Sequence, residues 1–142
     1  MQPIEHNLQV KADRRAAYNA VATLAGIKGW WAKNSDVGEQ EGGEVELRFT
    51  KPDMSAVINF DVTGLEPMRR VEWTCTRNSN PIWPGSKLIW EIEPAASGSL
   101  VRFRHEGFSD GGPAYDRTVE GWQLYMDSLR AYLDGGQAYP SD

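Results

Sequence analysis

The chain has 142 residues, of which 40% are hydrophobic and 25% charged, and 20 acidic against 15 basic side chains give it a net charge of −5. This composition predicts one globular domain over residues 1–142 with a buried core, and the acidic balance argues against nucleic-acid binding, which needs a basic face. No apolar run approaches the roughly 20 residues of a membrane span, the N-terminus lacks a signal-peptide pattern, and a lone cysteine excludes an internal disulfide, so we expect a cytoplasmic protein.

The predicted elements begin with a strand and two short helices. Apolar and polar side chains alternate over residues 4–10, which indicates a strand with one buried face. Asp13 is a favourable N-cap for a helix over residues 14–23, and a second short helix is predicted over residues 24–31. Residues 34–43 are polar and rich in glycine, so they predict a loop with room for one short strand.

The middle of the chain predicts a series of strands. The same alternation recurs in five segments, at residues 45–49, 58–62, 71–75, 88–92 and 101–105. They are separated by turns at residues 51–53, 66–69 and 94–99 and by a longer loop at residues 78–85. Strands joined by short connections pair as an antiparallel meander, and the apolar face of such a sheet needs a cover.

A long amphipathic helix is predicted from Pro113 to Asp134. Its apolar positions recur at steps of three and four residues, at Tyr115, Val119, Trp122, Met126, Leu129 and Leu133. Gly112 can act as the N-cap, and Gly135 or Gly136 can end the helix in the left-handed conformation, which gives a length of about 33 Å. This is the only predicted element long enough to cover the sheet, so the predicted fold class is α+β.

Gly121 lies in the middle of this helix, beside Trp122. A glycine at such a position costs about 1 kcal/mol relative to alanine. The sequence leaves two interpretations open: a tolerated glycine, or a position where sheet backbone or a ligand comes close to the helix.

Nine short motifs, in this order and spacing, carry a resemblance to a known family. They are Ala12-Asp13-Arg14, Gly29-Trp30-Trp31, Gly42-Gly43, Leu65-Glu66-Pro67-Met68-Arg69-Arg70-Val71, Trp73, His105-Glu106-Gly107-Phe108, Gly121-Trp122, Leu129 and Tyr132-Leu133. Over nearly its whole length the chain resembles the activator of Hsp90 ATPase homologue 1-like family, part of the START/Bet v 1-like superfamily. That superfamily also includes the Bet v 1 allergens and polyketide cyclases.

The resemblance implies a helix-grip fold, in which a curved antiparallel sheet of about seven strands wraps around the long C-terminal helix. It also implies a cavity between the sheet and that helix. The eukaryotic co-chaperone that gives the family its name carries a separate N-terminal domain, for which 142 residues leave no space. Hsp90 is therefore only a secondary candidate partner, and the fold alone does not select among lipid carriers, receptors and cyclases.

Large aromatic side chains either fill a core or line an apolar pocket, and this chain has six tryptophans. Strand alternation and the helical stripe direct a set of candidate ligand-binding residues toward the gap between sheet and helix: Trp30, Phe49, Phe60, Trp73, Trp90, Phe103, Trp122 and Met126. The sequence leaves open whether a ligand cavity persists among these side chains or whether they close into a core.

His6 and His105 share strand faces with apolar residues and are predicted to point inward. In a helix-grip sheet the first and last strands pair, so we expect the two histidines to be neighbours. Our hypothesis is a polar patch at one end of an apolar cavity, which hydrogen-bonds a ligand or supplies an acid or base, with Tyr115 or Tyr125 as further polar contacts. The alternative is two separate core-edge histidines whose hydrogen bonds are satisfied.

Other chemical sites are not predicted. Cys75 shares the buried face of its strand and is expected to be inert. A metal site would need a third ligand beside the two histidines, and Glu106 should point to the opposite face from His105. The glycine pairs lack the context of a phosphate-binding loop, so no cofactor is expected and no catalytic residue is assigned.

These features predict a protein that binds a small hydrophobic molecule, aromatic or lipid-like, between its sheet and its long helix. A first alternative is a cyclase- or dehydratase-type enzyme that uses the same cavity. A second is a protein-interaction module like the Hsp90 activators, which should expose an apolar patch around Trp83 in the loop at residues 78–85.

Overall fold

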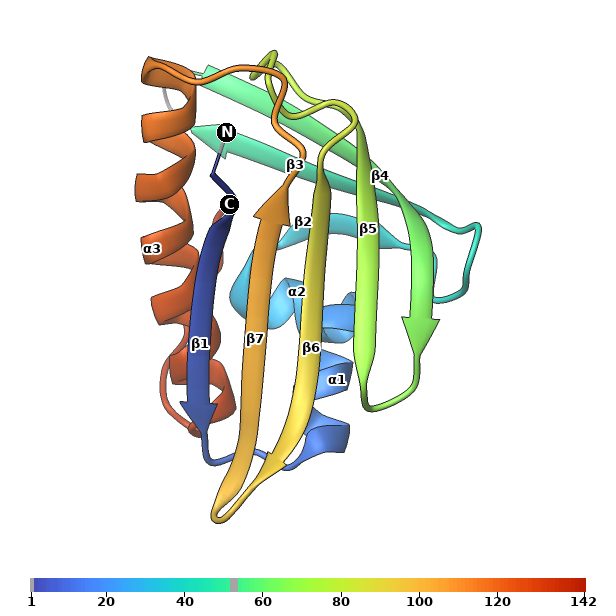
Figure 1. Cartoon of the computed structure of the whole chain (residues 1–142), viewed down its shortest axis with the longest axis vertical. Helices are drawn as coiled ribbons and strands as arrows, with labels where there is room; N and C mark the ends of the chain where they lie inside the picture. Colours follow the sequence, from blue (N-terminus) through green and yellow to red (C-terminus); the bar gives the residue numbers. More distant parts are fainter. Residues whose placement is uncertain (1, 52–53) are drawn as a thin grey trace.

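The computed structural model describes residues 2–51 and 54–142, which form a seven-stranded antiparallel sheet and three helices (Figure 1). In chain order the elements are β1 (Ile4–Val10), α1 (Arg14–Ala22), α2 (Leu24–Trp30), β2 (Asn34–Val37), β3 (Glu44–Lys51), β4 (Met54–Glu66), β5 (Arg70–Arg77), β6 (Lys87–Ala95), β7 (Gly98–Glu106) and α3 (Pro113–Leu133). The predicted fold class is therefore confirmed. The turn predicted at residues 51–53 falls largely outside the described residues.

The strands follow the order β1-β7-β6-β5-β4-β3-β2 across the sheet. From β2 to β7, strands that are consecutive in the sequence pair with each other, as expected for strands joined by short turns. β1 closes this series by pairing with β7, where Ile4 lies opposite His105 and His6 opposite Phe103. β2 is the short strand for which the glycine-rich segment left room.

The two short helices are separated by a single residue that acts as a cap for both. Asp13 begins α1 as predicted, because its Oδ1 accepts a hydrogen bond from the Ala16 amide at 2.9 Å. Thr23 ends α1, and its Oγ1 accepts from the Gly26 amide at 3.1 Å to begin α2. α1 packs on β5, β6 and β7, behind the sheet in the view of Figure 1.

α3 runs along the β1 edge of the sheet, on the same side as α1 and α2, and it contacts β1 and both short helices (Figure 1). Gly112 and Gly135 flank it with positive φ angles of 76° and 81°, the conformation that glycine adopts most readily. The predicted stripe is the buried face at Trp122, Met126, Leu129 and Leu133, whereas Tyr115 and Val119 are half-buried. No helix in the described part of the chain is long and apolar enough to cross a membrane.

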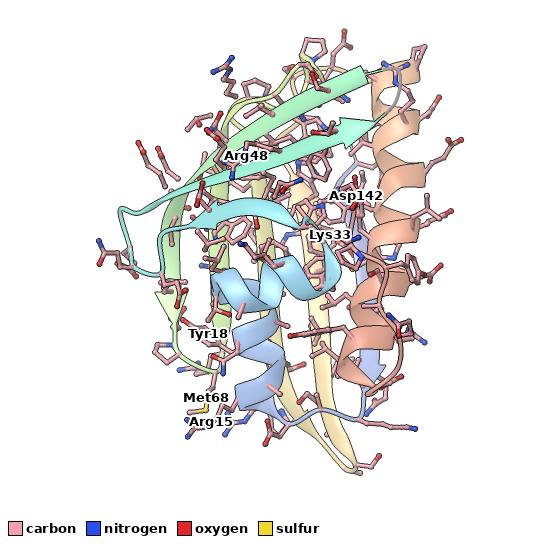
Figure 2. All side chains as sticks on the ribbon, turned by 180° about the vertical axis from the view of Figure 1, so that it is seen from behind. Arg15, Tyr18, Lys33, Arg48, Met68 and Asp142 are labelled. Carbon is pink, nitrogen blue, oxygen red and sulfur yellow. The ribbon has the colours of Figure 1, made fainter. Side chains whose placement is uncertain are left out.

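The C-terminal segment returns to the end of α2 and fastens it to β3. The Ser141 amide donates to the Trp31 carbonyl at 2.8 Å, and the Thr50 amide of β3 donates to the Asp142 carbonyl at 2.8 Å. Lys33 and Asp142 form an exposed ion pair at 2.9 Å, and both residues are labelled in Figure 2. Main-chain hydrogen bonds rather than this exposed pair provide the attachment, because such pairs contribute little to stability.

Close backbone approach occurs at Gly26 and not at Gly121. A Cβ atom at Gly26 would lie against the Asn19 carbonyl oxygen and at 2.5 Å from Ala20 Cα, both in α1. At Gly121 the nearest atom to such a Cβ would be Tyr125 Cε2 at 3.9 Å. The interpretation that sheet backbone passes close to Gly121 is therefore wrong, whereas an approaching ligand stays possible because Gly121 faces open space.

These two glycines form a matched pair for a stability test. Gly26→Ala should lower the free energy of unfolding by about 1–3 kcal/mol, because the new methyl group would force α1 and α2 apart. Gly121→Ala should raise it by up to about 1 kcal/mol through helix propensity. Urea denaturation followed by circular dichroism measures both, and equal effects of the two substitutions would contradict the assigned packing.

Candidate functional site

Most of the predicted ligand-binding side chains pack against one another in the core. Trp30, Phe60, Trp73, Trp90, Phe103 and Met126 are each no more than 2% exposed. Trp73 meets the edge of the Trp90 ring at a centroid distance of 5.2 Å, and Phe103 lies 4.3 Å from the Trp122 ring. The rings thus occupy the space between the sheet and α3 as a close-packed core.

His105 lies in this core with both ring nitrogens hydrogen-bonded. Trp122 Nε1 donates to His105 Nδ1 at 3.0 Å, so Nδ1 is unprotonated and the ring proton is on Nε2. His105 Nε2 donates to Ser86 Oγ at 2.8 Å, and Ser86 Oγ donates to the Trp83 carbonyl at 2.5 Å. This arrangement matches the alternative of a satisfied core histidine, with no free nitrogen for a ligand.

Burial lowers the pKa of both histidines, but to different extents. His105 is fully buried, and desolvation lowers its pKa to about 3, so its ring is neutral at physiological pH. His6 is half-buried beside the Phe103 ring, at a centroid distance of 6.4 Å, and burial lowers its pKa less strongly. Among the described residues His6 makes no side-chain hydrogen bond, so the two histidines share a sheet face without forming a joint polar group.

An open cleft lies between the N-terminal half of α3, the β3–β4 pair and the loop at residues 78–85. It consists of two adjoining hollows, of about 140 and 270 Å³, that share Ile58, Asn78, Asn80, Arg117 and Tyr125. We call it the α3 cleft; its remaining lining residues are Phe49, Ala56, Ser79, Trp83, Thr118, Gly121 and Trp122. Of the ten predicted ligand-binding residues, Phe49 and Trp122 line it.

The floor of the α3 cleft is apolar and its rim is polar. Phe49, Ile58, Trp83 and Trp122 are each at most 8% exposed, so they present fixed ring and methyl surfaces. Trp83 Nε1 donates to Thr118 Oγ1 at 3.0 Å, which ties the loop to α3. Trp83 is 6% exposed, so the exposed patch predicted around it is not formed.

A second and larger groove, of about 610 Å³, lies between α1, α2 and the end of α3. Small side chains line much of it, including Ala12, Ala16 and Ala25, and the Glu39 carboxylate in it accepts a hydrogen bond from the Leu24 amide at 3.1 Å. Its one aromatic lining residue, Tyr132, is exposed rather than part of a buried floor, and Glu39 is already used to cap α2. The α3 cleft is the better candidate site, because an apolar floor with a few polar groups is typical of ligand pockets.

Sequence reasoning named Gly121 and Tyr125 as candidate ligand contacts but missed Arg117 and the place of Trp83, which complete the cleft. Arg117, Gly121 and Tyr125 recur every four residues, which places them in one row beside the buried stripe of α3. That spacing was a usable signal for a second face of the helix. Trp83 lies in a loop between Pro81 and Pro84 without strand alternation, so nothing in the sequence indicated that it folds back onto the core.

Cysteine and metal chemistry do not enter the site. Cys75 is buried on β5, and desolvation raises the pKa of its thiol to about 11, which keeps it protonated and unreactive. Glu106 lies on the outer face and accepts a hydrogen bond from Arg104. In residues 2–51 and 54–142 no cluster of three histidine, cysteine or carboxylate side chains could hold a metal ion.

Acid titration tests the buried state of His105. Between pH 6.5 and about 3 the unfolded chain binds a proton that native His105 does not, so stability should fall by about 1.4 kcal/mol per pH unit as pH decreases. His105→Gln removes this contribution, and the variant should show a shallower decline between pH 6 and 4. His6→Gln is the control and should change the slope less, whereas parallel profiles for wild type and His105→Gln would contradict the assignment.

Comparisons with solved structures find the same fold along the whole chain. The Aha1 dimer of Colwellia psychrerythraea is 25% identical, with a TM-score of 0.81 over 97% of this chain and 100% of that chain. Mll3558 of Rhizobium loti is 18% identical, with a TM-score of 0.79 over 93% and 96% of the two chains. The AHSA1-like protein of Aeromonas hydrophila is 15% identical, with a TM-score of 0.74 over 94% and 93%.

A search of curated proteins finds no match. The family model described as "Activator of Hsp90 ATPase homolog 1-like protein" matches residues 11–134, a stretch that runs from the end of β1 to the end of α3. The match therefore includes both short helices, the sheet from β2 to β7 and the lining of the α3 cleft. The chain belongs to the activator of Hsp90 ATPase homologue 1-like family of the START/Bet v 1-like superfamily.

Proposed function

We propose that the protein binds a small hydrophobic molecule, aromatic or lipid-like, in the α3 cleft. The observation that carries this proposal is the pairing of Trp83 and Trp122, whose parallel rings lie 6.2 Å apart beneath an open cleft. A flat apolar molecule above these rings would cover the apolar surface that Trp83, Phe49, Ile58 and the half-buried Ala56 together leave open in the cleft, so surface would be removed from water on both sides of the contact. The polar rim would then set its orientation.

The filled core supports the cleft, rather than an enclosed cavity, as the place of binding. A ligand between sheet and helix would have to displace rings such as Trp73 and Trp90, at most 1% exposed, and lose their packing energy. A ligand in the α3 cleft leaves these contacts intact. Phe49 and Trp122 are therefore the predicted ligand-binding residues that we retain as direct contacts.

Gly121 gives the sharpest test, because its missing side chain leaves the cleft open. Wild-type protein should bind 1-aminoanthracene, an uncharged aromatic fluorophore, and Gly121→Leu should weaken this binding at least about 10-fold by filling the cleft. Fluorescence titration measures the affinities. Circular dichroism checks that the variant is folded, which is expected because leucine favours the helix and a Cβ atom at this position meets no backbone.

The control for this test is Leu124→Ala on the same helix. Leu124 is 64% exposed and does not line the cleft, so its replacement should leave the affinity unchanged. Equal affinities for wild type and Gly121→Leu would overturn the proposal, and so would an absence of binding to folded wild-type protein.

A second candidate function is interaction with Hsp90, favoured by the family description and by the 25% identity to the Colwellia Aha1. The measurement is the ATPase rate of a bacterial Hsp90 with and without the protein. An increase that Gly121→Leu leaves unchanged would assign a role on another surface, independent of the cleft. An unchanged rate at saturating protein would count against this candidate.

A further inference from the structure

Among the side chains that the structure describes, Arg117 is the one charged group that lines the α3 cleft. It is exposed on α3, one helical turn before Gly121, and it lines both hollows. On the outer sheet face Arg48 and Arg102 lie against carboxylates at 2.7 Å. Within the described part of the chain Arg117 forms no ion pair, so its guanidinium is free to pair with an anion.

The acceptor groups at the rim are already engaged within the protein. Asn78 Oδ1 accepts from the Asn80 amide at 3.1 Å, and Asn80 Oδ1 accepts from the Ile82 amide at 3.3 Å. Thr118 Oγ1 accepts from Trp83 Nε1 at 3.0 Å and donates to the Ala114 carbonyl at 2.9 Å. A ligand therefore meets few free acceptors for its own hydrogen-bond donors.

Donors, in contrast, remain available at the rim. No partner for Asn78 Nδ2 is found among residues 2–51 and 54–142. The Tyr125 hydroxyl lies instead beside the buried Trp31 indole. Together with the five N–H groups of the Arg117 guanidinium, Asn78 Nδ2 forms a rim that offers protons to acceptor oxygens.

We propose that the α3 cleft selects an amphipathic carboxylate, with its apolar body on Trp83 and Trp122 and its carboxylate paired with Arg117. The inference rests on the proposed ligand-binding function and names the ligand class. A carboxylate matches the planar fork of one guanidinium through two parallel hydrogen bonds. The hollows of about 140 and 270 Å³ lie at the small end of ligand pockets, so the body has the size of a two-ring aromatic or a medium alkyl chain.

The net charge of −5 makes this selection a local property. Asp116 and Glu120 are exposed neighbours of Arg117 along α3, and neither lines the cleft. The negative net charge of the protein repels anions, so a preference for a carboxylate has to come from the rim of the cleft. Added salt should weaken the carboxylate contact, because Arg117 is exposed to solvent.

The test compares two ligands that differ only in the charged group. Wild-type protein should bind 1-naphthaleneacetate roughly 10-fold more tightly than 1-naphthaleneacetamide, as expected for a charge-assisted hydrogen bond at a partly exposed site. Arg117→Gln should abolish this preference and leave the affinity for the amide unchanged. Quenching of tryptophan fluorescence and isothermal titration calorimetry both measure the affinities.

Arg130→Gln is the matched control, because Arg130 is an exposed arginine in the last turn of α3 that does not line the cleft. It changes net charge by the same amount and should leave the preference intact. Decanoate and decanol repeat the comparison with an alkyl body, and tighter binding of decanoate than of naphthaleneacetate would assign a fatty-acid source. The reverse order would assign an aromatic acid.

The failure of this inference differs from failure of the proposed function. Equal affinities for acid and amide in the wild type, with both bound, would overturn the carboxylate preference alone. A similar loss of preference in Arg117→Gln and Arg130→Gln would overturn it as well, because net charge would then be the cause. If folded wild-type protein binds neither naphthalene compound nor 1-aminoanthracene, the proposed function fails with it.

Discussion

The hydrogen bond from the Trp122 indole to His105 Nδ1 joins α3 to β7 at the centre of the core. It fixes the ring proton of His105 on Nε2, which directs the Ser86 hydroxyl to the Trp83 carbonyl and so holds the loop at residues 78–85. One buried polar chain thus sets the positions of helix, strand and loop. Because each member is satisfied, burial of these groups carries no unpaired-donor penalty.

The same series of hydrogen bonds explains why the candidate site is a cleft and not an enclosed cavity. Trp122 turns inward to reach His105, and Phe103 packs on its ring at 4.3 Å. Trp83 follows from the other side and lies parallel to Trp122. These buried rings close the space that a helix-grip fold can offer to a ligand, and the remaining hollow lies outside them, beside Gly121.

The sequence predicted the elements well because each rests on local patterns. Alternation marked the strands from β3 to β7, Asp13 marked the start of α1, and the flanking glycines marked both ends of α3. The inward direction of His105 and Trp122 also followed from strand and helix geometry. The alternation along a strand does not show how closely the inward residues pack, since packing depends on side-chain volumes from several elements at once. The sequence therefore left open whether the rings close the space between sheet and helix, and it did not show that Trp83 packs onto the core.

Different residues of α3 pack in the core and line the cleft. Trp122 and Met126 face the sheet, where a change of one methylene group alters packing that the whole domain needs. Arg117, Gly121 and Tyr125 occupy the neighbouring row, where a Cβ atom added at Gly121 would meet Tyr125 Cε2 at 3.9 Å and no backbone. Substitutions in that row change the shape and charge of the cleft without entering the core. If the cleft binds the proposed ligand, its specificity can therefore change along one row of α3 while the tryptophan core, and with it the stability of the domain, is kept.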